Sequence, residues 1–332
     1  MSFRVSIADV AREAGVSRQT VSRALNQKSE ISDATLQRVL AVIDRLDYRP
    51  STIARGLATR HTRTIGLIVP DIANAFFADI GRGADDLVHP AGYSLLLRNT
   101  TEDPDRETDL LRSLEDRSVD GVLVCSSRLS DDDLAQLVAR YDAAVLINRV
   151  LPGVGSVCVD DAYGAALRVA HLLRSARRRI GLLTGARMSH SGRERERGYC
   201  EALIEAGMPV DPALMVRCAS PDIEHGYQAA LQLLAMQREI DSLVCYNDLV
   251  ATGALRACAE LGRRVPDDIA VTGADDILLA GLVTPALTTV RSDRQAIGAA
   301  AARMLLDQLN GAANGCQSLI IQPELIIRAS AP

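Results

Sequence analysis

The chain has 332 residues, of which 48% are hydrophobic and 24% are charged, and its formal net charge is −5. This composition excludes wholesale disorder and fibrous repeats, and at roughly 100 to 200 residues per domain the length predicts two or three packed units. No apolar run approaches the roughly 18 residues that span a bilayer, and the N-terminus lacks the apolar stretch of a signal peptide. We therefore expect a cytoplasmic protein with no membrane partner.

The charge is divided unevenly along the chain. Residues 1–64 carry eleven basic and six acidic side chains, a net charge of +5, whereas the remainder carries 26 basic and 36 acidic ones, a net charge of −10. A basic head on an acidic body predicts that the head binds a polyanion. Chance clustering of surface charge is the alternative, and the charge count alone does not decide between the two.

Two short helices are predicted in the basic head. Ser6 with Asp9 three residues later is typical of a helix N-terminus, and Gly15 is suited to the left-handed conformation that ends a helix. Ser17 opens a second helix almost at once. A connection this short fits the angled helix pair of a helix-turn-helix unit.

A third helix is predicted from Ser32, and its apolar side chains form one face that can cover the first two helices: Leu36, Val39, Leu40, Ile43 and Leu46. Pro50 ends this helix. The next segment, residues 52–59, is short and contains Gly56. We expect it to become helical only against a partner.

Four stretches of the head carry a resemblance to a known family: Ile7-Ala8-Asp9-Val10-Ala11, Gly15-Val16-Ser17, Thr20-Val21-Ser22-Arg23-Ala24-Leu25-Asn26 and Tyr48-Arg49-Pro50-Ser51-Thr52-Ile53-Ala54-Arg55-Gly56-Leu57. They resemble the lactose/purine/ribose repressor (LacI/GalR) family of bacterial transcription regulators. The resemblance implies that Arg18, Gln19 and Arg23 read the major groove and that Leu57 enters the minor groove beside Ala54. The DNA-binding candidates are Ser17, Arg18, Gln19, Thr20, Ser22, Arg23, Asn26, Ala54, Arg55 and Leu57.

Beyond the head, short apolar runs alternate with helical stretches. This rhythm predicts parallel sheets of the doubly wound α/β type, and 269 residues are enough for two of them. The predicted strands are residues 65–69, 94–97, 121–125, 143–147, 180–183, 242–245 and 269–272. In such sheets ligands bind beyond the carboxyl ends of the strands.

The sequence predicts no catalytic, metal or cofactor site. Gly81-Arg82-Gly83 lacks the third glycine of the dinucleotide-binding pattern, and the sequence contains neither a phosphate-binding loop nor a G-x-S-x-G motif. The five histidines have no metal-ligand spacing. The seven cysteines are odd in number and form no C-x-x-C pair, so they indicate buried thiols.

The remainder of the chain resembles the family's effector domain, the type I periplasmic-binding-protein fold, in which the chain crosses three times between two subdomains. The resemblance implies an all-α helix-turn-helix domain at residues 1–50, a hinge helix and linker at 51–63, and an effector-binding and dimerisation domain at 64–332. The subdomains would be approximately 64–162 plus 292–322, and 163–291 plus 323–332.

The same resemblance implies a set of effector-binding residues at the strand ends: Asn74, Phe76, Phe77, Asn148, Arg149, Ser189, Ser191, Arg195, Asn247 and Asp275. Any one of them could instead be a strand-end residue that satisfies backbone groups. Ala274 and Pro221 stand where relatives often carry an aromatic residue, and the chain has no Trp and only three Phe. Asp, Asn and Arg suit hydroxyl groups, which both donate and accept, so we expect a sugar or polyol.

Together these patterns predict a homodimeric transcriptional repressor that binds double-stranded operator DNA of pseudopalindromic sequence and responds to a small effector. They do not distinguish an inducer from a corepressor. One alternative is a sugar- or nucleotide-converting enzyme on a Rossmann-like sheet with a regulatory head, which the missing phosphate loops oppose. Another is a solute-binding protein, which the absence of a signal peptide and the basic head oppose.

Overall fold

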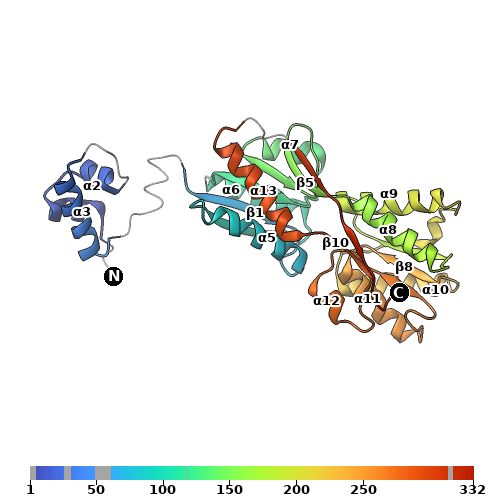
Figure 1. Cartoon of the computed structure of the whole chain (residues 1–332). Coiled ribbons are helices and arrows are strands. Elements are labelled where there is room, and N and C mark those ends of the chain that lie inside the picture. Colours follow the sequence, from blue (N-terminus) through green and yellow to red (C-terminus); the bar gives the residue numbers. More distant parts are fainter. Residues whose placement is uncertain (1–4, 26–30, 49–60, 118, 313–316) are drawn as a thin grey trace. The chain divides into compact units, whose positions relative to one another are not determined.

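The computed structural model describes residues 5–25, 31–48, 61–117, 119–312 and 317–332. Contacts between residues divide the chain into two units, Met1–Thr62 and Arg63–Pro332, which we call the head and the body (Figure 1). Within the described ranges, no helix combines the length and the hydropathy that crossing a membrane requires.

The described part of the head contains three helices: α1 (Ile7–Ala14), α2 (Arg18–Leu25) and α3 (Asp33–Arg45). The predicted signals at the ends of α1 are confirmed. Ser6 Oγ accepts a hydrogen bond from the Asp9 N–H, the Asp9 carboxylate accepts one from the Ser6 N–H, and Gly15 has a φ of 65°. Ser17 Oγ accepts from the Thr20 N–H at 3.1 Å and so caps the start of α2.

The core of the head is small and consists mainly of Val and Ala side chains. The predicted apolar face of α3 is wrong at one position, because Leu40 does not belong to this core whereas Val42 does. Val39 and Val42 are three residues apart and share a helix face, while Leu40 lies about 100° around the helix from Val39. The other predicted residues of this face, Leu36, Ile43 and Leu46, pack against the core while remaining partly exposed.

The body consists of two α/β subdomains, as predicted (Figure 1). The first has a parallel six-stranded sheet with the order β11-β5-β4-β3-β1-β2. Helices α5 and α13 cover one face of this sheet, and α6 and α7 cover the other. The elements are β1 (Thr64–Val69), α5 (Ala75–Val88), β2 (Ser94–Asn99), α6 (Pro104–Asp116), β3 (Gly121–Cys125), α7 (Asp131–Val138), β4 (Ala144–Ile147), β5 (Gly155–Val159), α13 (Arg294–Leu309) and β11 (Ser318–Ile321).

The second subdomain has a parallel four-stranded sheet with the order β7-β6-β8-β9. Helices α10 and α11 pack on one face, and α8 and α9 pack on the other. The elements are α8 (Asp161–Arg174), β6 (Ile180–Thr184), α9 (His190–Glu205), a 3-10 helix (Pro212–Leu214), β7 (Met215–Arg217), α10 (Ile223–Met236), β8 (Ser242–Cys245), α11 (Asp248–Glu260), β9 (Ala270–Thr272) and α12 (Leu278–Leu282).

The chain passes between the subdomains three times. It crosses from β5 to α8, from β10 (Thr289–Arg291) to α13, and from β11 to β12 (Glu324–Ile326). Strands β10 and β12 pair with each other in antiparallel orientation, whereas β11 adds to the edge of the first sheet beside β5. Each subdomain is therefore assembled from segments that are far apart in sequence.

All seven predicted strands are present, with ends within two residues of the predicted ones. The described residues contain five further strands that were not predicted, namely β5, β7, β10, β11 and β12. Strands β7, β10 and β12 have three residues each and include a charged residue, so no apolar run marks them, and β11 is mostly exposed. In β5 the residues Gly155 and Ser156 interrupt the apolar run.

Glycines allow α5 and α13 to touch backbone to backbone. A Cβ atom on Gly83 would lie 2.0 Å from the carbonyl oxygen of Gln295, and a Cβ atom on Gly298 would lie 2.0 Å from that of Ile80. Both distances are far below van der Waals contact. The pair Gly81 and Gly83, which failed the dinucleotide pattern, thus lies in a helix whose packing explains the second glycine.

Candidate functional site

The outer face of α2 carries exposed polar side chains: Ser17, Arg18, Gln19, Ser22 and Arg23. Thr20 is half-buried, and its hydroxyl oxygen lies 2.9 Å from that of Ser17, so both residues also hold the start of the helix. A helix face of guanidinium, amide and hydroxyl groups can donate to base edges and phosphates. Four further candidates lie outside the described residues, namely Asn26, Ala54, Arg55 and Leu57.

A hollow lies between the two subdomains of the body. Its empty volume is about 320 Å³, part of it open to solvent. Eight of the ten effector candidates line it: Asn74, Phe76, Phe77, Asn148, Ser191, Arg195, Asn247 and Asp275. Asn148 follows a strand directly, and Asn247 and Asp275 lie two and three residues beyond one, which is where an open parallel sheet places its ligand.

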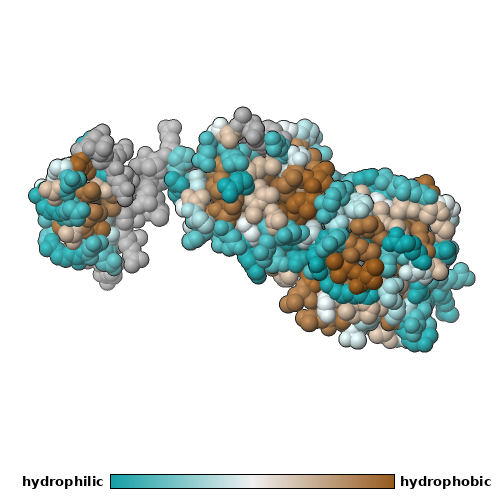
Figure 2. Space-filling model, viewed as in Figure 1, coloured by the Kyte–Doolittle hydropathy of each residue, from teal (hydrophilic) through white to brown (hydrophobic). Residues whose placement is uncertain are grey.

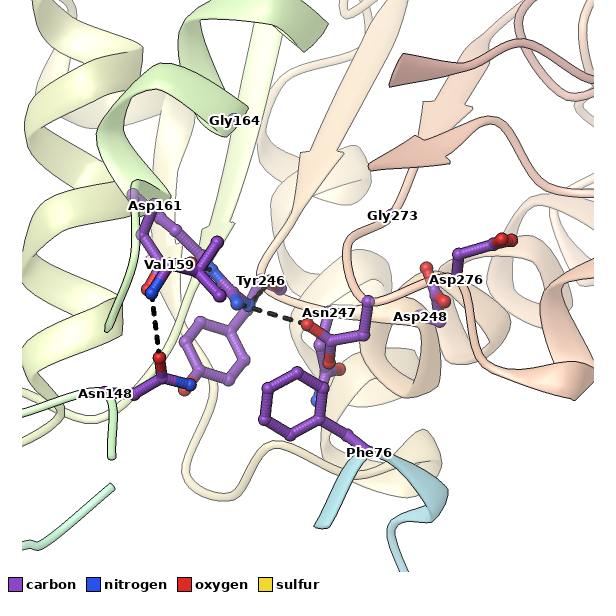
Figure 3. A network of polar contacts seen from close by, with 12 residues as sticks. Phe76, Asn148, Val159, Asp161, Gly164, Tyr246, Asn247, Asp248, Gly273 and Asp276 are labelled. Carbon is purple, nitrogen blue, oxygen red and sulfur yellow. Dashed lines mark hydrogen bonds and ion pairs between the residues drawn. The ribbon is translucent and has the colours of Figure 1, made fainter. Parts of the chain in front are cut away.

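Arg195 of α9 holds three groups around this hollow. Its Nε lies 2.7 Å from Asp161 Oδ1, its Nη2 lies 3.1 Å from Asp275 Oδ1, and its Nη1 donates to the Tyr246 carbonyl oxygen at 2.6 Å. Asp161, Tyr246 and Phe76 surround the same space (Figure 3). Arg195, Asp161 and Asp275 are all buried. The three bonds of the guanidinium leave two of its five N–H groups for a ligand.

Several candidates also serve the backbone. Asn74, Ser189 and Asn247 are the N-caps of α5, α9 and α11, and the side-chain oxygen of each accepts a hydrogen bond from a backbone N–H. Asn148 Oδ1 accepts from the Val159 N–H at 3.1 Å (Figure 3). The amide N–H groups of Asn74 and Asn148 remain for a ligand.

Two effector candidates do not line the hollow. Ser189 reaches it only through Tyr246, whose hydroxyl oxygen lies 3.0 Å from Ser189 Oγ. Arg149 donates from Nη2 to the Leu129 carbonyl oxygen at 3.0 Å and to Asp131 Oδ1 at 2.5 Å. The structure therefore places the Arg149 side chain against the start of α7 and not in the hollow.

Other residues line the hollow without having been candidates: Glu102, Ser126, Arg128, Pro221 and Tyr246. Glu102 and Arg128 each lie three residues beyond the end of a strand, as Asp275 does, but neither is among the positions that the family resemblance implies. A search of whole strand-end loops for opposite charges could have found this pair.

The aromatic rings of Phe76, Phe77 and Tyr246 contribute to the lining of the hollow. The low number of aromatic residues in the whole chain therefore does not predict how much aromatic surface lines the hollow. The expectation of a hydroxyl-rich ligand rests instead on the Asp, Asn and Arg side chains, which supply both donors and acceptors.

Left-handed backbone conformations cluster around the hollow. Four non-glycine residues in its lining have φ values between 49° and 106°: Glu102, Ser126, Asn148 and Asp275. Such conformations cost about 1–3 kcal/mol each and persist only where their surroundings hold them. At Asp275 the holding group is Arg294, whose Nη1 donates to the carbonyl oxygens of Asp275 and Asp276.

Two buried carboxyl groups near the hollow have raised pKa values. Burial, together with the neighbouring Asp275 charge, raises the pKa of Asp248 to about 8, and burial raises the pKa of Asp275 to about 6. Both values exceed the unfolded pKa of about 4. The protonated carboxyls therefore stabilise the fold fully below about pH 4, and this contribution is lost as the pH rises through the folded pKa values.

We expect Asp248→Asn to remove most of this pH dependence. The neutral amide keeps an oxygen that can accept the Ile277 N–H bond, which is 2.9 Å long in the wild type. Between about pH 5 and about pH 9 the free energy of unfolding of the variant, relative to the wild type, should rise by a few kcal/mol. Denaturant unfolding of both proteins across this range measures the difference, and parallel pH profiles would contradict the burial of a titrating Asp248.

Comparison with known proteins gives matches over nearly the whole chain. Residues 6–51 match the family model described as bacterial regulatory proteins, lacI family, and residues 62–329 match that of periplasmic binding proteins and sugar binding domain of LacI family. The chain is 34% identical to the HTH-type transcriptional repressor PurR of Photobacterium profundum, over 98% of both chains.

Solved structures give the same result. The lac repressor dimer bound to operator and the anti-inducer ONPF is similar with a TM-score of 0.88 and 27% identity, covering 98% of this chain and 99% of that one. A complex of the transcriptional regulator CelR with cellobiose is similar with a TM-score of 0.75 and 31% identity, covering 98% of this chain and all of that one.

Proposed function

The chain belongs to the LacI family of bacterial regulatory proteins, and we propose that it binds operator DNA as a homodimer whose affinity is set by a small sugar or polyol in the hollow. It is a DNA-binding transcriptional regulator and not an enzyme. The observation that carries the proposal is the presence in one chain of the polar outer face of α2 and of the Arg195–Asp275 pair in the hollow. Such a regulator acts in the cytoplasm, where its operator is.

We assign residues 1–50 to DNA binding, 51–63 to the hinge and linker, and 64–332 to effector binding and dimerisation. Leu278 and Leu282 of α12 support a dimer, because they are 78% and 69% exposed and lie four residues apart on one helix face. Figure 2 shows a hydrophobic area at the position of α12. A twofold dimer presents two heads to two half-sites of a pseudopalindrome.

In the DNA-binding role, Arg18→Ala and Gln19→Ala should each relax the base preference at one or two operator positions. A good base contact contributes about 1–3 kcal/mol of discrimination, and both side chains project from the outer face of α2. Operator affinity should also fall steeply with salt, because the Arg-rich head releases counterions from phosphate. Protein-binding DNA arrays measure the base preference of each variant.

Arg12→Ala is the matched control for these two variants. Arg12 is an exposed arginine of the same head, but it lies on α1 and pairs with Asp9 at 2.6 Å. It should keep the wild-type base preference. An unchanged preference in both Arg18→Ala and Gln19→Ala would remove these residues from the base-reading set. Leu57 and Ala54 remain predicted minor-groove residues, and Arg55 remains a predicted DNA-binding residue.

In the effector role, the hollow offers paired donors and acceptors. Arg195 and Asp275 come from the second subdomain, while Asn74 and Asn148 come from the first, so a ligand that contacts both sets stabilises one relative arrangement of the subdomains. An effector changes operator affinity only as far as it binds one arrangement better than another. The complex of a relative with cellobiose supports a carbohydrate in this role.

A further inference from the structure

A second buried arginine lines the hollow from the first subdomain. Arg128 donates from Nε to Glu102 Oε2 at 2.5 Å and from Nη2 to Glu102 Oε1 at 3.0 Å, which makes a two-bond ion pair. Its Nη1 donates to the Ser126 carbonyl oxygen at 2.6 Å. The side chain of Arg128 is 5% exposed and that of Glu102 is 19% exposed.

Arg128 repeats the arrangement of Arg195 in the other subdomain. Each guanidinium makes two bonds to carboxylate oxygens and one to the carbonyl oxygen of the residue directly after a strand, Ser126 after β3 and Tyr246 after β8. Each therefore keeps two of its five N–H groups. The carboxylate oxygens that they hold also keep lone pairs, so both sides of the hollow can donate and accept.

The charges on the two sides are balanced. On the first side Arg128 offsets Glu102, and burial raises the pKa of the neighbouring Glu107, whose carboxylate accepts a hydrogen bond from the Arg128 backbone N–H at 2.9 Å. On the second, Arg195 and the fully buried Arg168, which donates to the carbonyl oxygens of Cys245 and Gly273, offset Asp161 and Asp275. An ionised ligand would meet no uncompensated opposite charge here, and desolvating it would cost several kcal/mol.

The backbone next to the Glu102–Arg128 pair is strained, and such strain persists only where the surrounding structure holds the residues in place. Thr101 and Glu102 have φ values of 55° and 60°, and Ser126, which accepts from Arg128, has a φ of 49°. Three left-handed non-glycine residues next to one ion pair cost stability, and such strain clusters where a ligand is held.

We propose that Glu102 and Arg128 bind hydroxyl groups of the effector opposite Arg195 and Asp275, and that these two balanced couples select an uncharged polyhydroxyl compound over its carboxylate or phosphate derivative. The inference rests on the proposed function, because it requires that the hollow is the effector site. It adds two specificity-determining residues and the exclusion of ionised sugars.

The test uses matched ligands on the full-length protein. D-Glucose, D-galactose, D-ribose, ribitol and cellobiose are compared with D-gluconate, D-galacturonate, D-glucose 6-phosphate and D-ribose 5-phosphate by thermal shift and calorimetry. We expect at least one uncharged compound to bind, and its ionised counterpart to bind at least about tenfold more weakly.

Glu102→Gln should reverse the order of the two affinities, because it removes the carboxylate that pairs with the Arg128 guanidinium. The uncharged ligand should bind roughly tenfold more weakly and the ionised counterpart more tightly than to the wild type. Glu115→Gln is the matched control, since Glu115 pairs with Arg140 at 3.1 Å elsewhere in the first subdomain. Glu102→Asp keeps the negative charge, so it should still bind the uncharged ligand more tightly than the ionised one. This variant provides a second test if Glu102→Gln folds poorly.

An outcome that contradicts this inference alone differs from one that also contradicts the carbohydrate effector. An ionised sugar as the best wild-type ligand, lost in Arg195→Ala, overturns the inference and leaves the effector site standing. Equal weakening of both ligand classes by Glu102→Gln, or reversed order in Glu102→Asp, also overturns it. If none of the uncharged compounds binds, both the inference and the carbohydrate effector are wrong.

Discussion

An Arg195→Ala protein should bind operator DNA like the wild type and lose its response to the effector. Removing the guanidinium leaves Asp161 and Asp275 buried without their cation, and breaking a buried pair costs about 3–5 kcal/mol. The effector itself loses the donors of Arg195, and hydroxyl groups left unpaired in the hollow cost about 1–3 kcal/mol, which is roughly 5- to 150-fold in effector affinity. Asp275→Ala should have the same effect, because it leaves Arg195 without one acceptor. The DNA candidates lie in the head, which is a separate unit.

Calorimetry of the wild type with pentoses, hexoses and nucleobases identifies the ligand, and fluorescence anisotropy of a labelled operator then measures the response. Arg197→Ala is the matched control, because Arg197 lies two residues further along α9, is half-exposed and pairs with Glu194 and Glu201. It should respond like the wild type. A full response in both Arg195→Ala and Asp275→Ala would contradict the site, and a nucleobase as the sole ligand would contradict the carbohydrate proposal.

Gly83→Ala should destabilise the body by about 3 kcal/mol, the upper part of the range for overpacked cores. The added methyl group would lie 2.0 Å from the Gln295 carbonyl oxygen, and a backbone atom in the middle of packed helices cannot rotate away as a side chain can. Helices α5 and α13 would have to separate. The apolar contacts of Ile80 and Ile297 in the core between these helices and the sheet would then weaken.

Gly81→Ala supplies the control for this prediction. A Cβ atom on Gly81 would lie 3.4 Å from the side chain of Leu67, which is an ordinary contact. Alanine also favours the helix over glycine by about 1 kcal/mol, so this variant should match or exceed the wild type in stability. Urea unfolding followed by circular dichroism compares the two variants. Equal free energies of unfolding for them would contradict the close approach of α5 and α13.

The sequence predicted the features that depend on local chemistry. The Ser6–Asp9 cap and the Gly15 terminator have their partners within four residues, and both are observed. The seven predicted strands each contain a short apolar run because helices cover both faces of each sheet, and such runs are visible in a single sequence. The family resemblance, together with the positions of the strand ends, indicated Asn74, Asn247 and Asp275. These residues follow strands or cap the helices after them.

Contacts that depend on the backbone conformation of a loop could not be predicted in this way. Asn148 and Arg149 are neighbours, yet only the first lines the hollow, because the left-handed conformation of Asn148 turns the following residue toward Asp131. Glu102 reaches Arg128 through the equally unusual conformations of Thr101 and Glu102 itself. A left-handed residue other than glycine leaves no sequence pattern that marks it.

The threefold crossing has a consequence for synthesis on the ribosome. Helix α13 supplies Ile297, Ala301 and Leu305 to the core of the first subdomain, and β11 completes its sheet, but both follow the entire second subdomain in sequence. About 200 residues separate α5 from α13, and translation at roughly 5–20 residues per second needs about 10–40 s to add them. During that interval the apolar face of α5 has no α13 to cover it. The growing chain therefore passes through an aggregation-prone stage that the finished fold does not reveal.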